Sequence, residues 1–415
     1  MEVLNPISAG MDVHRDTVVV TILKSLPSGR TWRETRTFET FSDSLRLMVA
    51  WLDEHQVPIA AMESTGVYWK PIYRMLRVQS PARTTWLVNP THAKNVPGRK
   101  TDVSDSHWIA KLLMHGLLAP SFLPNVQCLE LRKLTRLRKK LVGDHSSLTN
   151  RIIKELEDSG IKLCGVVADV MGKSGRAMIE ALVEGTKTPD QMADLARGRM
   201  KSKRAKLMRA LDGQLSDTSK FEIRVLLRLS DEMSAAIAKM DERIGLMLEP
   251  MRAEAERLLA VPGVKLVSAA AVLAEIGSDM SIFASSDRIV SWAGLSPGSR
   301  ESAGKKMHVG TRRGSFWLRV YLVEAAWCAV RTRGTFWNRK YSSLVSRLGP
   351  KQAIVAIARR MLVAIYYMLR DGVAYRELGQ SYTPSQDVER RVTRLVAQLK
   401  SLGKDVAIQP AKTAA

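Results

Sequence analysis

The sequence predicts an α/β amino-terminal domain of the ribonuclease H-like (RuvC-like) class, an α-helical coiled-coil middle and a mainly α carboxy-terminal domain. Strand patterns open the chain and then alternate with helix patterns, which is the order of that fold class. Farther along the chain, apolar residues recur at helical spacing instead. The domains are expected at 1–125, 126–256 and 257–382, followed by a polar tail at 383–415.

The amino-terminal elements follow from short runs of β-branched and apolar residues separated by polar turns. Residues 7–13 and 17–23 are two such runs joined by His-Arg-Asp, which indicates a hairpin. Residues 31–39 alternate in the manner of a third strand. Ser42 is expected to cap the helix that follows at 42–55. The later elements alternate in type: strand 58–64, helix 67–77, strand 84–90 and helix 102–118.

The middle of the chain predicts a coiled-coil arm. Apolar residues in 223–247 alternate steps of three and four, with one polar exception, and a looser stripe in 131–152 supplies a partner helix. Between the stripes, GKSGRAM and RGRMKSKRAKLMR indicate a connecting region with a strongly basic edge. Simple helix packing produces the same stripes and is the alternative. The expected core positions are Ile223, Leu226, Ser230, Met233, Ile237, Met240, Ile244 and Met247, with Leu131, Leu134, Leu141, Leu148 and Ile152 on the partner.

The charge of the chain points to a polyanionic partner. Its 64 Lys and Arg residues exceed 41 Asp and Glu residues, giving a net charge of +23, and this excess most often serves nucleic acid. Clusters at 132–140 and 197–209 are expected to meet phosphate backbones. The three cysteines are isolated, which indicates neither a disulfide framework nor a zinc site. With no signal-peptide pattern and no unbroken apolar run of spanning length, we expect a cytoplasmic, nucleoid-associated protein without a membrane partner.

Four carboxylates are candidates for chemistry. Asp12 lies on the first strand, Glu63 ends the fourth, and Asp102 and Asp105 begin the last helix of the domain. In a ribonuclease H-like sheet such side chains converge at strand ends. Four carboxylates there can bind two Mg²⁺ ions, which clamp a phosphodiester and activate the attacking oxygen. Singly, each has a plainer explanation: a solvated strand end for Asp12, a helix cap for Glu63, and a favourable helix first turn for the aspartates.

A glycine turn offers a second candidate site. Residues 258–277 have the pattern of a helix-hairpin-helix, in which Pro-Gly-Val joins two helices. Gly263 lets such a turn approach a phosphate, and the backbone N–H groups of the next helix donate to it. Contacts of this kind hold nucleic acid without reading its sequence. A plain helical hairpin with a glycine turn is the alternative.

The segment 293–319 combines small hydroxyl side chains with cations. Cations stabilise the charge that develops during attack on a phosphodiester, and serine can form the covalent ester. On chemistry alone, Ser302 competes with Ser296, Ser299 and Ser315, and a solvated basic loop is the simple alternative. The cations that we expect to contact nucleic acid here are Lys305, Lys306, Arg312 and Arg313.

Six segments together resemble a known family. In order they are MDVHRDTVVV, MESTGVYWKPIY, WLVNPTHAKNVPGRKTDVSDSHWIAKLL, VPGV with AEIG, WAGLSPGSRESAGKK and RRGSFWLR. They resemble the transposases of the insertion-sequence one-ten family, which includes the Piv-type DNA invertases, over almost the whole chain. Matched residue by residue, the family's DEDD carboxylates fall on Asp12, Glu63, Asp102 and Asp105, and its nucleophilic serine falls on Ser302. Many relatives have Ser-Gly at the last of these positions, where this chain has Ser302-Ala303-Gly304.

The resemblance implies a DNA transposase that excises and inserts a mobile element, with Mg²⁺ and a composite site of carboxylates and serine. It also implies guidance by a structured bridge RNA, and we expect a homo-oligomer, a dimer or a tetramer. Arg99 and Lys100, which precede the aspartates, are then expected to contact a phosphate backbone. Two other functions fit parts of the sequence: a RuvC-like junction nuclease in which water attacks, and a non-catalytic architectural nucleic-acid-binding protein.

Overall fold

The computed structural model divides the chain into two compact units, Met1–Leu123 and Pro124–Ala415. It describes residues 2–64, 66–89, 105–298, 301–302, 305–306, 310–311, 314–379, 382 and 385–408, with only the backbone described at 301, 302, 305, 306, 385–388, 390 and 391. Residues of interest outside this set are Arg99, Lys100, Asp102, Ser299, Arg312 and Arg313.

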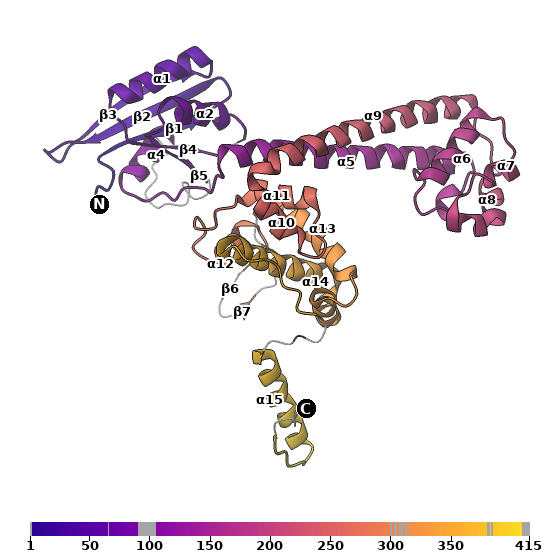
Figure 1. The fold of residues 1–415 in the computed structure, drawn as a ribbon. Coiled ribbons are helices and arrows are strands. Elements are labelled where there is room, and N and C mark those ends of the chain that lie inside the picture. Colours follow the sequence, from indigo (N-terminus) through magenta and orange to yellow (C-terminus); the bar gives the residue numbers. More distant parts are fainter. Residues whose placement is uncertain are drawn as a thin grey trace. The chain divides into compact units, whose positions relative to one another are not determined.

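The amino-terminal unit is built on a mixed five-stranded sheet in the order β3-β2-β1-β4-β5 (Figure 1). β1 (Ile7–Val13) pairs antiparallel with β2 (Thr17–Ser25), which pairs antiparallel with β3 (Thr31–Glu39). On its other side β1 pairs parallel with β4 (Ile59–Glu63), and β4 pairs parallel with β5 (Thr84–Val88). The observed strands therefore lie where the period-two patterns predict them.

Helices cover both faces of this sheet. α1 (Ser42–Glu54) and α2 (Trp69–Gln79) pack on one face, where their buried side chains share a core with Met11 and Met62. α4 (Asp105–Met114) packs on the opposite face through a separate core with Ala61. Burying both faces is what makes β4 read as a continuous apolar run rather than an alternating one.

The predicted cap of α1 is wrong. Phe41, not Ser42, occupies the N-cap position, and no side chain there accepts a hydrogen bond from the first turn. The Ser44 hydroxyl instead accepts a hydrogen bond from the Glu39 N–H at 3.0 Å. This bond ties the end of β3 to the first turn of α1, so a local polar contact replaces the expected cap.

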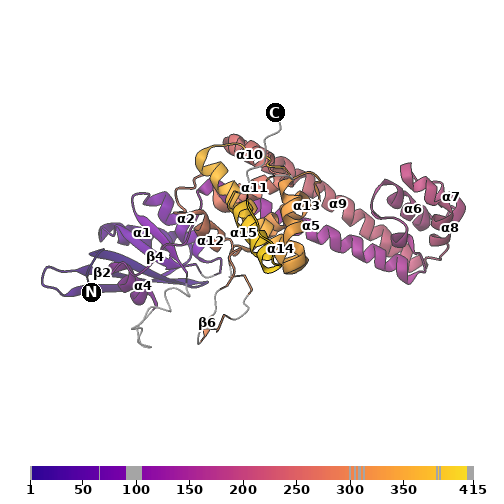
Figure 2. The same ribbon diagram turned by 90° about the horizontal axis from the view of Figure 1, so that it is seen from below.

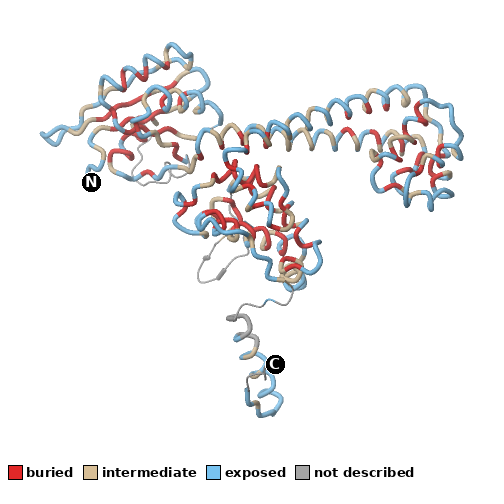
Figure 3. Tube along the Cα trace, in the orientation of Figure 1, coloured by how far each residue is buried: buried red, intermediate tan, exposed pale blue. Residues whose placement is uncertain are grey.

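In the second unit, two long helices form an arm. α5 (Val126–Asp158) and α9 (Asp217–Leu248) run side by side in both ribbon views (Figures 1 and 2). At 1.5 Å per residue, an α-helix as long as α5 extends about 50 Å. Every expected core position is buried or partly buried, but those between Met233 and Met240 are only partly buried (Figure 3). The two helices are therefore covered best near the two ends of the arm.

The residues between α5 and α9 form a small module, the tip, which spans 159–216. It has its own hydrophobic core, in which Ile161, Met178 and Leu207 are fully buried and pack with Ile152 and Ile223 of the arm. α7 begins with a capping box between Thr188 and Gln191, and this fixes its first turn. The elements of the tip are η1 (Leu163–Gly165), α6 (Lys173–Glu184), α7 (Pro189–Ala193), η2 (Gly198–Lys203) and α8 (Arg204–Ala210).

The remaining helices form a second core around α11 (Leu266–Ile276). Residues 269–276 of α11 are all buried, and its small alanines allow close packing with its neighbours. The surrounding elements are η3 (Glu249–Met251), α10 (Arg252–Leu259), α12 (Ser286–Trp292), β6 (Glu301–Ser302), β7 (Lys305–Lys306), α13 (Phe316–Arg331) and α14 (Phe336–Asp371). The predicted polar tail contains α15 (Ser385–Ser401).

One helix is long and apolar enough to raise the question of a membrane. Within the described part of the chain, α14 alone meets that criterion of length and composition, and over half of its apolar window is buried inside the unit. Gly349 has a φ of 74° and precedes Pro350, so α14 is two helices joined at a kink. These features are typical of a core helix rather than a spanning one.

Candidate active site

Two carboxylates lie side by side at one end of the sheet. β1 and β4 are parallel neighbours in which Gly10 lies opposite Ala61, so two residues farther on the register aligns Asp12 with Glu63. Because side chains alternate along a strand, Asp12 shares the sheet face of Gly10, and Glu63 shares that of Ala61. Gly10 and Ala61 both lie against α4. The two carboxylates therefore belong to the α4 face, at the carboxyl ends of their strands.

The direction of α4 brings a third carboxylate toward the same end. The Ser8 hydroxyl donates a hydrogen bond to the carbonyl of Ala110 at 3.2 Å, whereas Gly10 lies against Ser106. Moving forward along β1 thus corresponds to moving backward along α4. Asp105, the first described residue of α4, consequently lies toward the carboxylate end of β1.

Gly10 positions this helix, and the sequence analysis did not single it out. A Cβ at this position would be 2.1 Å from the carbonyl oxygen of Ser106. Any side chain would push α4, and with it Asp105, away from the sheet. The Ser106 hydroxyl also lies 2.9 Å from the Thr21 hydroxyl, within hydrogen-bonding distance, which fixes α4 to β2. The available signal was the glycine itself, because a glycine inside a strand often marks a close backbone approach.

Histidines accompany two of these carboxylates. His14 Nε2 lies 3.2 Å from Asp12 Oδ2, and the His14 side chain is exposed, so solvent weakens this pair. His107 lies two residues beyond Asp105, with its Nδ1 3.4 Å from Arg33 Nη1. Burial lowers the pKa of His107, and the nearby Arg33 charge lowers it further. Without a bound anion, His107 is therefore mostly neutral at neutral pH.

The donor set at this end of the sheet fits a divalent cation in its chemistry, because magnesium prefers carboxylate oxygens. Across the described residues, no three metal-ligating side chains lie close enough together to hold an ion. Asp102, the fourth predicted carboxylate, lies outside those residues. Asp12 is 27% exposed, which leaves its oxygens partly open to solvent. Asp12, Glu63 and Asp105 therefore gather toward one end of the domain, whereas the metal site itself stays a proposal.

Ser302 belongs to a small hairpin between α12 and α13. β6 and β7 pair antiparallel, with Ser302 opposite Lys305. A bridge between Pro297 and Thr311 closes the base of the hairpin. The backbone register thus sets the predicted serine beside one of the predicted cations, as attack on a phosphodiester requires.

Two glycines cross where this hairpin leaves the helical core. A Cβ on Gly314 would be 2.2 Å from the backbone nitrogen of Gly294. Position 314 therefore does not tolerate a side chain. The N–H of Ser315 donates to the carbonyl of Trp292 at 3.0 Å and joins the two sides of the crossing. The hairpin therefore starts and ends at a fixed point of the core.

Ser315 itself has a structural role. Its hydroxyl accepts a hydrogen bond from the N–H of Leu318 and so caps α13. The same hydroxyl lies 3.3 Å from a carboxylate oxygen of Glu275, to which it donates. These contacts occupy the Ser315 hydroxyl and remove it from the competition with Ser302.

Glu275 is the centre of a buried ion network that the sequence analysis missed. It is 2% exposed, and Arg136 of α5 binds it through two parallel hydrogen bonds of 2.8 and 2.9 Å. Arg132 donates to the backbone carbonyl of Ala274 at 2.7 Å. Burial lowers the pKa of Arg132 to about 10, although the Glu275 charge opposes this shift. The network joins α5, α11 and α13 at the end of the arm opposite the tip, around Arg132 and Arg136, which we call the foot of the arm.

Most cations of cluster 132–140, which is predicted to meet phosphate, have carboxylate partners within this unit. Arg132 and Arg136 serve Glu275, and Arg138 pairs with Asp241 across the arm. The other contacts are Lys133 with Glu130 and Lys139 with Glu324. Arg136, Arg138 and Lys139 thus join α5 to α11, α9 and α13, whereas the Lys133 pair lies within α5.

Gly263 also has a different partner from the one predicted. The expected helical hairpin is present as α10 and α11, and Gly263 adopts a φ of +86° in the turn. A Cβ there would be 2.2 Å from the carbonyl oxygen of Ala325 and 2.7 Å from the nitrogen of Ala329. The close approach that this glycine permits is therefore to α13. This favours the plain helical hairpin over a phosphate contact at Gly263.

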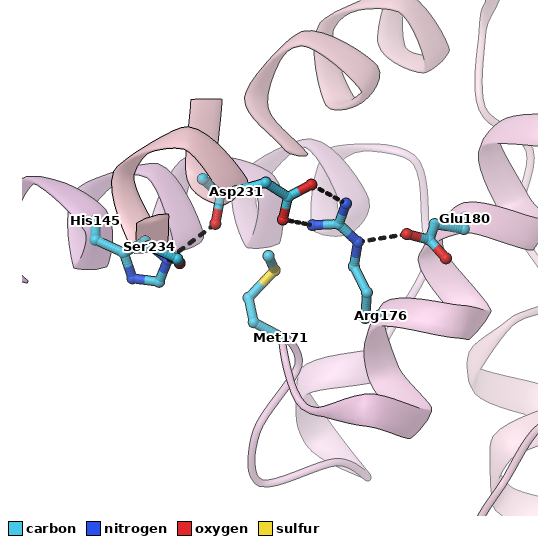
Figure 4. Close-up of a pocket in the computed structure, with 7 residues that line it drawn as sticks. His145, Met171, Arg176, Glu180, Asp231 and Ser234 are labelled. Carbon is cyan, nitrogen blue, oxygen red and sulfur yellow. Dashed lines mark hydrogen bonds and ion pairs between the residues drawn. The ribbon is translucent and has the colours of Figure 1, made fainter. Parts of the chain in front are cut away.

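A pocket of about 380 Å³ lies where the arm meets the tip (Figure 4). Arg176 of α6 reaches across it to Asp231 of α9, with hydrogen bonds of 3.0 and 2.7 Å, and also bonds Glu180 at 2.6 Å. His145 Nε2 lies 2.9 Å from the Ser230 hydroxyl. The polar groups of this pocket satisfy one another, so it is a joint between helices and none of the predicted catalytic residues lines it.

Comparison with known families covers both units. Residues 9–160 match a family model described as a transposase of the DEDD, IS110 type. Residues 255–342 match a model described as transposase of the IS116/IS110/IS902 family. Together the two matches cover more than half of the chain. The first contains Asp12, Glu63, Asp102 and Asp105, and the second contains Ser302.

Individual relatives agree with these matches. The uncharacterized 42 kDa protein of insertion element IS900 from Mycobacterium paratuberculosis is 28% identical over 66% of this chain and 73% of its own length. The transposase for insertion sequence element IS1111A from Coxiella burnetii is 26% identical over 70% of this chain and 73% of its own length. A probable family 20 transposase from Pseudomonas aeruginosa is 26% identical over 77% of this chain and 86% of its own length.

Proposed function

The chain belongs to the IS116/IS110/IS902 family of transposases, and we propose that it excises and inserts a mobile DNA element through four carboxylates and one serine. The carboxylates are Asp12, Glu63, Asp102 and Asp105, and the serine is Ser302. The observation that carries the proposal is the gathering of Asp12, Glu63 and Asp105 toward the carboxyl ends of β1 and β4. Carboxylates that come from separate segments and point to one end of a sheet are typical of a functional site in such folds.

The strand order supports a ribonuclease H-like fold for this unit. Three antiparallel strands followed by two parallel ones, with helices on both faces, give the order expected for that class. The paired α5 and α9 likewise support a coiled-coil spacer between the carboxylate domain and a carboxy-terminal transposase domain.

In the proposed reaction, the Ser302 hydroxyl attacks the phosphorus of a DNA strand. A bond forms between phosphorus and Oγ, and a bond between phosphorus and a deoxyribose oxygen breaks. Serine loses its proton to solvent, and the deoxyribose oxygen takes one up and leaves as a hydroxyl. Because the ester conserves the energy of the broken bond, rejoining the strand needs no other energy source. Bound Mg²⁺ would supply positive charge that stabilises the transition state and lowers the pKa of the attacking oxygen. Lys305, Lys306, Arg312 and Arg313 stabilise the negative charge on the phosphoryl oxygens.

The proposed partners are polyanions. A net charge of +23 supports binding to the DNA of the element ends and target, and to a structured bridge RNA that selects them. Arg99 and Lys100 would hold a phosphate backbone beside the carboxylates. We further propose a homo-oligomer, a dimer or a tetramer, that acts at the nucleoid in the cytoplasm.

Cleavage of DNA that carries the element ends tests the carboxylates. Asp12→Asn, Glu63→Gln and Asp105→Asn should each lower the cleavage rate by on the order of 100-fold or more, because each removes a charge from the reacting centre. Asp16→Asn is the matched control, since Asp16 is exposed in the turn after β1 and is predicted to leave the rate unchanged. Fluorescence anisotropy should show unchanged DNA binding in all four variants.

Two outcomes would replace the proposal. Cleavage at the wild-type rate by Asp12→Asn would remove the carboxylate mechanism. No cleavage by the wild-type protein, with nucleic-acid binding intact, would favour an architectural nucleic-acid-binding protein. Loss of cleavage in the carboxylate variants with full activity in Ser302→Ala would favour the junction nuclease, in which water is the nucleophile.

A further inference from the structure

We propose that the tip is a separate binding surface that grips the backbone of duplex DNA at the far end of the arm. This inference rests on the proposed function only for the identity of its partner as DNA. The surface consists of η2 and α8, which carry the basic segment 197–209. This segment contains seven Lys and Arg residues and no acidic residue.

The cations of this segment are open to solvent. All seven are exposed. Arg204 pairs with Asp190 and Asp194, and the Lys203 ammonium donates to the carbonyl of Val166 at 2.9 Å. The other five have no ion-pair partner within the described part of the chain: Arg197, Arg199, Lys201, Lys206 and Arg209. Folding has not used these charges, so they repel one another until an anion binds.

The scaffold below these cations holds them in place. The tip has its own buried core, and Arg204 ties α8 to the α7 region through its two aspartates. The Arg176 bonds to Asp231 fix α6 to α9 of the arm, and its bond to Glu180 within α6 holds the guanidinium in place (Figure 4). Because the backbone is already ordered, less conformational entropy is lost when the cations bind a ligand. The exposed cations are therefore presented together from a fixed backbone.

The composition of the tip favours duplex DNA over unpaired nucleic acid. Residues 159–216 contain no Phe, Trp, Tyr or His, so the tip has no ring on which an unpaired base could stack. Exposed Lys and Arg side chains contact phosphates, and phosphate contacts carry no sequence information. An arm of about 50 Å corresponds to roughly one and a half turns of B-DNA, so the tip reaches DNA well away from the foot of the arm.

Salt-dependent binding of the full-length chain tests this surface. The tip variant combines Arg199→Gln, Lys201→Gln, Lys206→Gln and Arg209→Gln. Its affinity for a 40-bp duplex of arbitrary sequence, measured by anisotropy without Mg²⁺, should fall roughly 10- to 100-fold at 0.1 M salt. The slope of log Kd against log salt should become shallower by about 2–4, because each lost phosphate contact removes about 0.9.

Two further variants separate this surface from general charge. Arg224→Gln, Arg228→Gln, Lys239→Gln and Arg243→Gln together make the same change in net charge at exposed positions of the arm. This control should keep the wild-type slope to within about one unit. Arg199→Lys with Arg209→Lys should bind DNA as the wild type does, since a phosphate contact needs charge rather than a planar fork.

The proposal fails if the tip variant binds the duplex with wild-type affinity and slope. It also fails if the variant binds a folded RNA more weakly but the duplex equally well, which would make the tip an RNA surface. The binding assay contains no cleavage step, so neither result bears on the carboxylates or Ser302. Conversely, if Ser302 is not the nucleophile, the result of the binding assay does not change.

Discussion

Two basic segments of the same chain have opposite fates. Segment 132–140 of α5 and segment 197–209 of the tip are both rich in Lys and Arg. In the first, Arg136 grips buried Glu275 and Arg138 grips Asp241, so the charges hold helices together. In the second, all seven cations are exposed, and only Arg204 has an ion pair among the described residues. Glu275 lies 139 positions from Arg136 in the sequence, and Asp241 lies 103 positions from Arg138.

This contrast shows that local charge density does not identify a ligand surface. A buried arginine with a fully satisfied partner contributes to folding, and removing its partner leaves an unpaired charge in a poor solvent. An exposed cluster of cations without ion pairs adds no such contact to the fold. Its charge stays available to an anionic ligand. The difference can be tested by substitutions that should affect stability in one segment and binding in the other.

Glu275→Ala should have the largest effect on stability. It strands Arg132 and Arg136 without their carboxylate and also removes the Ser315 contact, which should cost about 3 kcal/mol. The low end of the usual range applies because Arg136 is partly exposed. Hydrogen exchange followed by mass spectrometry should show exchange in α11 and α13 faster by roughly 100-fold.

The matched control is Asp287→Ala, which removes the exposed partner of Arg359. It should change exchange in the same peptides by less than about fivefold, since exposed pairs contribute about 1 kcal/mol at most. Equal effects of Glu275→Ala and Asp287→Ala would mean that the buried network does not stabilise the foot of the arm.

Exchanging arginine for lysine should give an intermediate effect in one segment and none in the other. Arg136→Lys loses the two-pronged bond to Glu275, so unfolding should become easier by about 1–2 kcal/mol. Arg199→Lys changes an exposed side chain and should alter stability by less than about 0.5 kcal/mol. Thermal unfolding monitored by circular dichroism compares the two variants. If both variants shift the thermal unfolding midpoint by the same amount, Arg136 contributes no more to stability than Arg199 does.

Lys133→Ala should have the smallest effect, although Lys133 lies in the same segment as Arg136. Its partner Glu130 is exposed and one helical turn away, so the loss should be about 0.3 kcal/mol and should vanish in 1 M salt. Thermal unfolding at low and high salt checks this. A large, salt-resistant loss would show that membership of the segment matters more than burial.

Much of the amino-terminal fold could be predicted because its signals are local. Alternation in residues 31–39 and the apolar run at 59–63 set strands within a residue or two of the observed ones. The predicted cap of α1 is wrong because the helix already begins at Ser42. The serine that bonds to the preceding strand is Ser44, which accepts from the Glu39 N–H. The tip was predicted only as a basic connection, since its short helices depend on burial against the arm.

The site was predicted unevenly for a similar reason. Asp12 and Glu63 could be found because acidic residues ending strands are visible in the sequence. Gly263 was assigned to phosphate because its turn pattern is local, whereas its actual neighbour is α13. Glu275 could not be predicted, because one glutamate in an alanine-rich helix gives no hint of two arginines on α5.

A covalent protein–DNA adduct is the most direct test of the proposed reaction. Wild-type protein incubated with the proposed bridge RNA, end-labelled element DNA and Mg²⁺ should give, on a denaturing gel, a labelled band that migrates with the protein. Ser302→Ala should abolish this band and keep DNA binding, whereas Ser296→Ala, which alters a serine outside the hairpin strands, should retain it. A labelled adduct of undiminished intensity in Ser302→Ala, or strand cleavage by that variant at the wild-type rate, would contradict the assignment of Ser302 as the nucleophile.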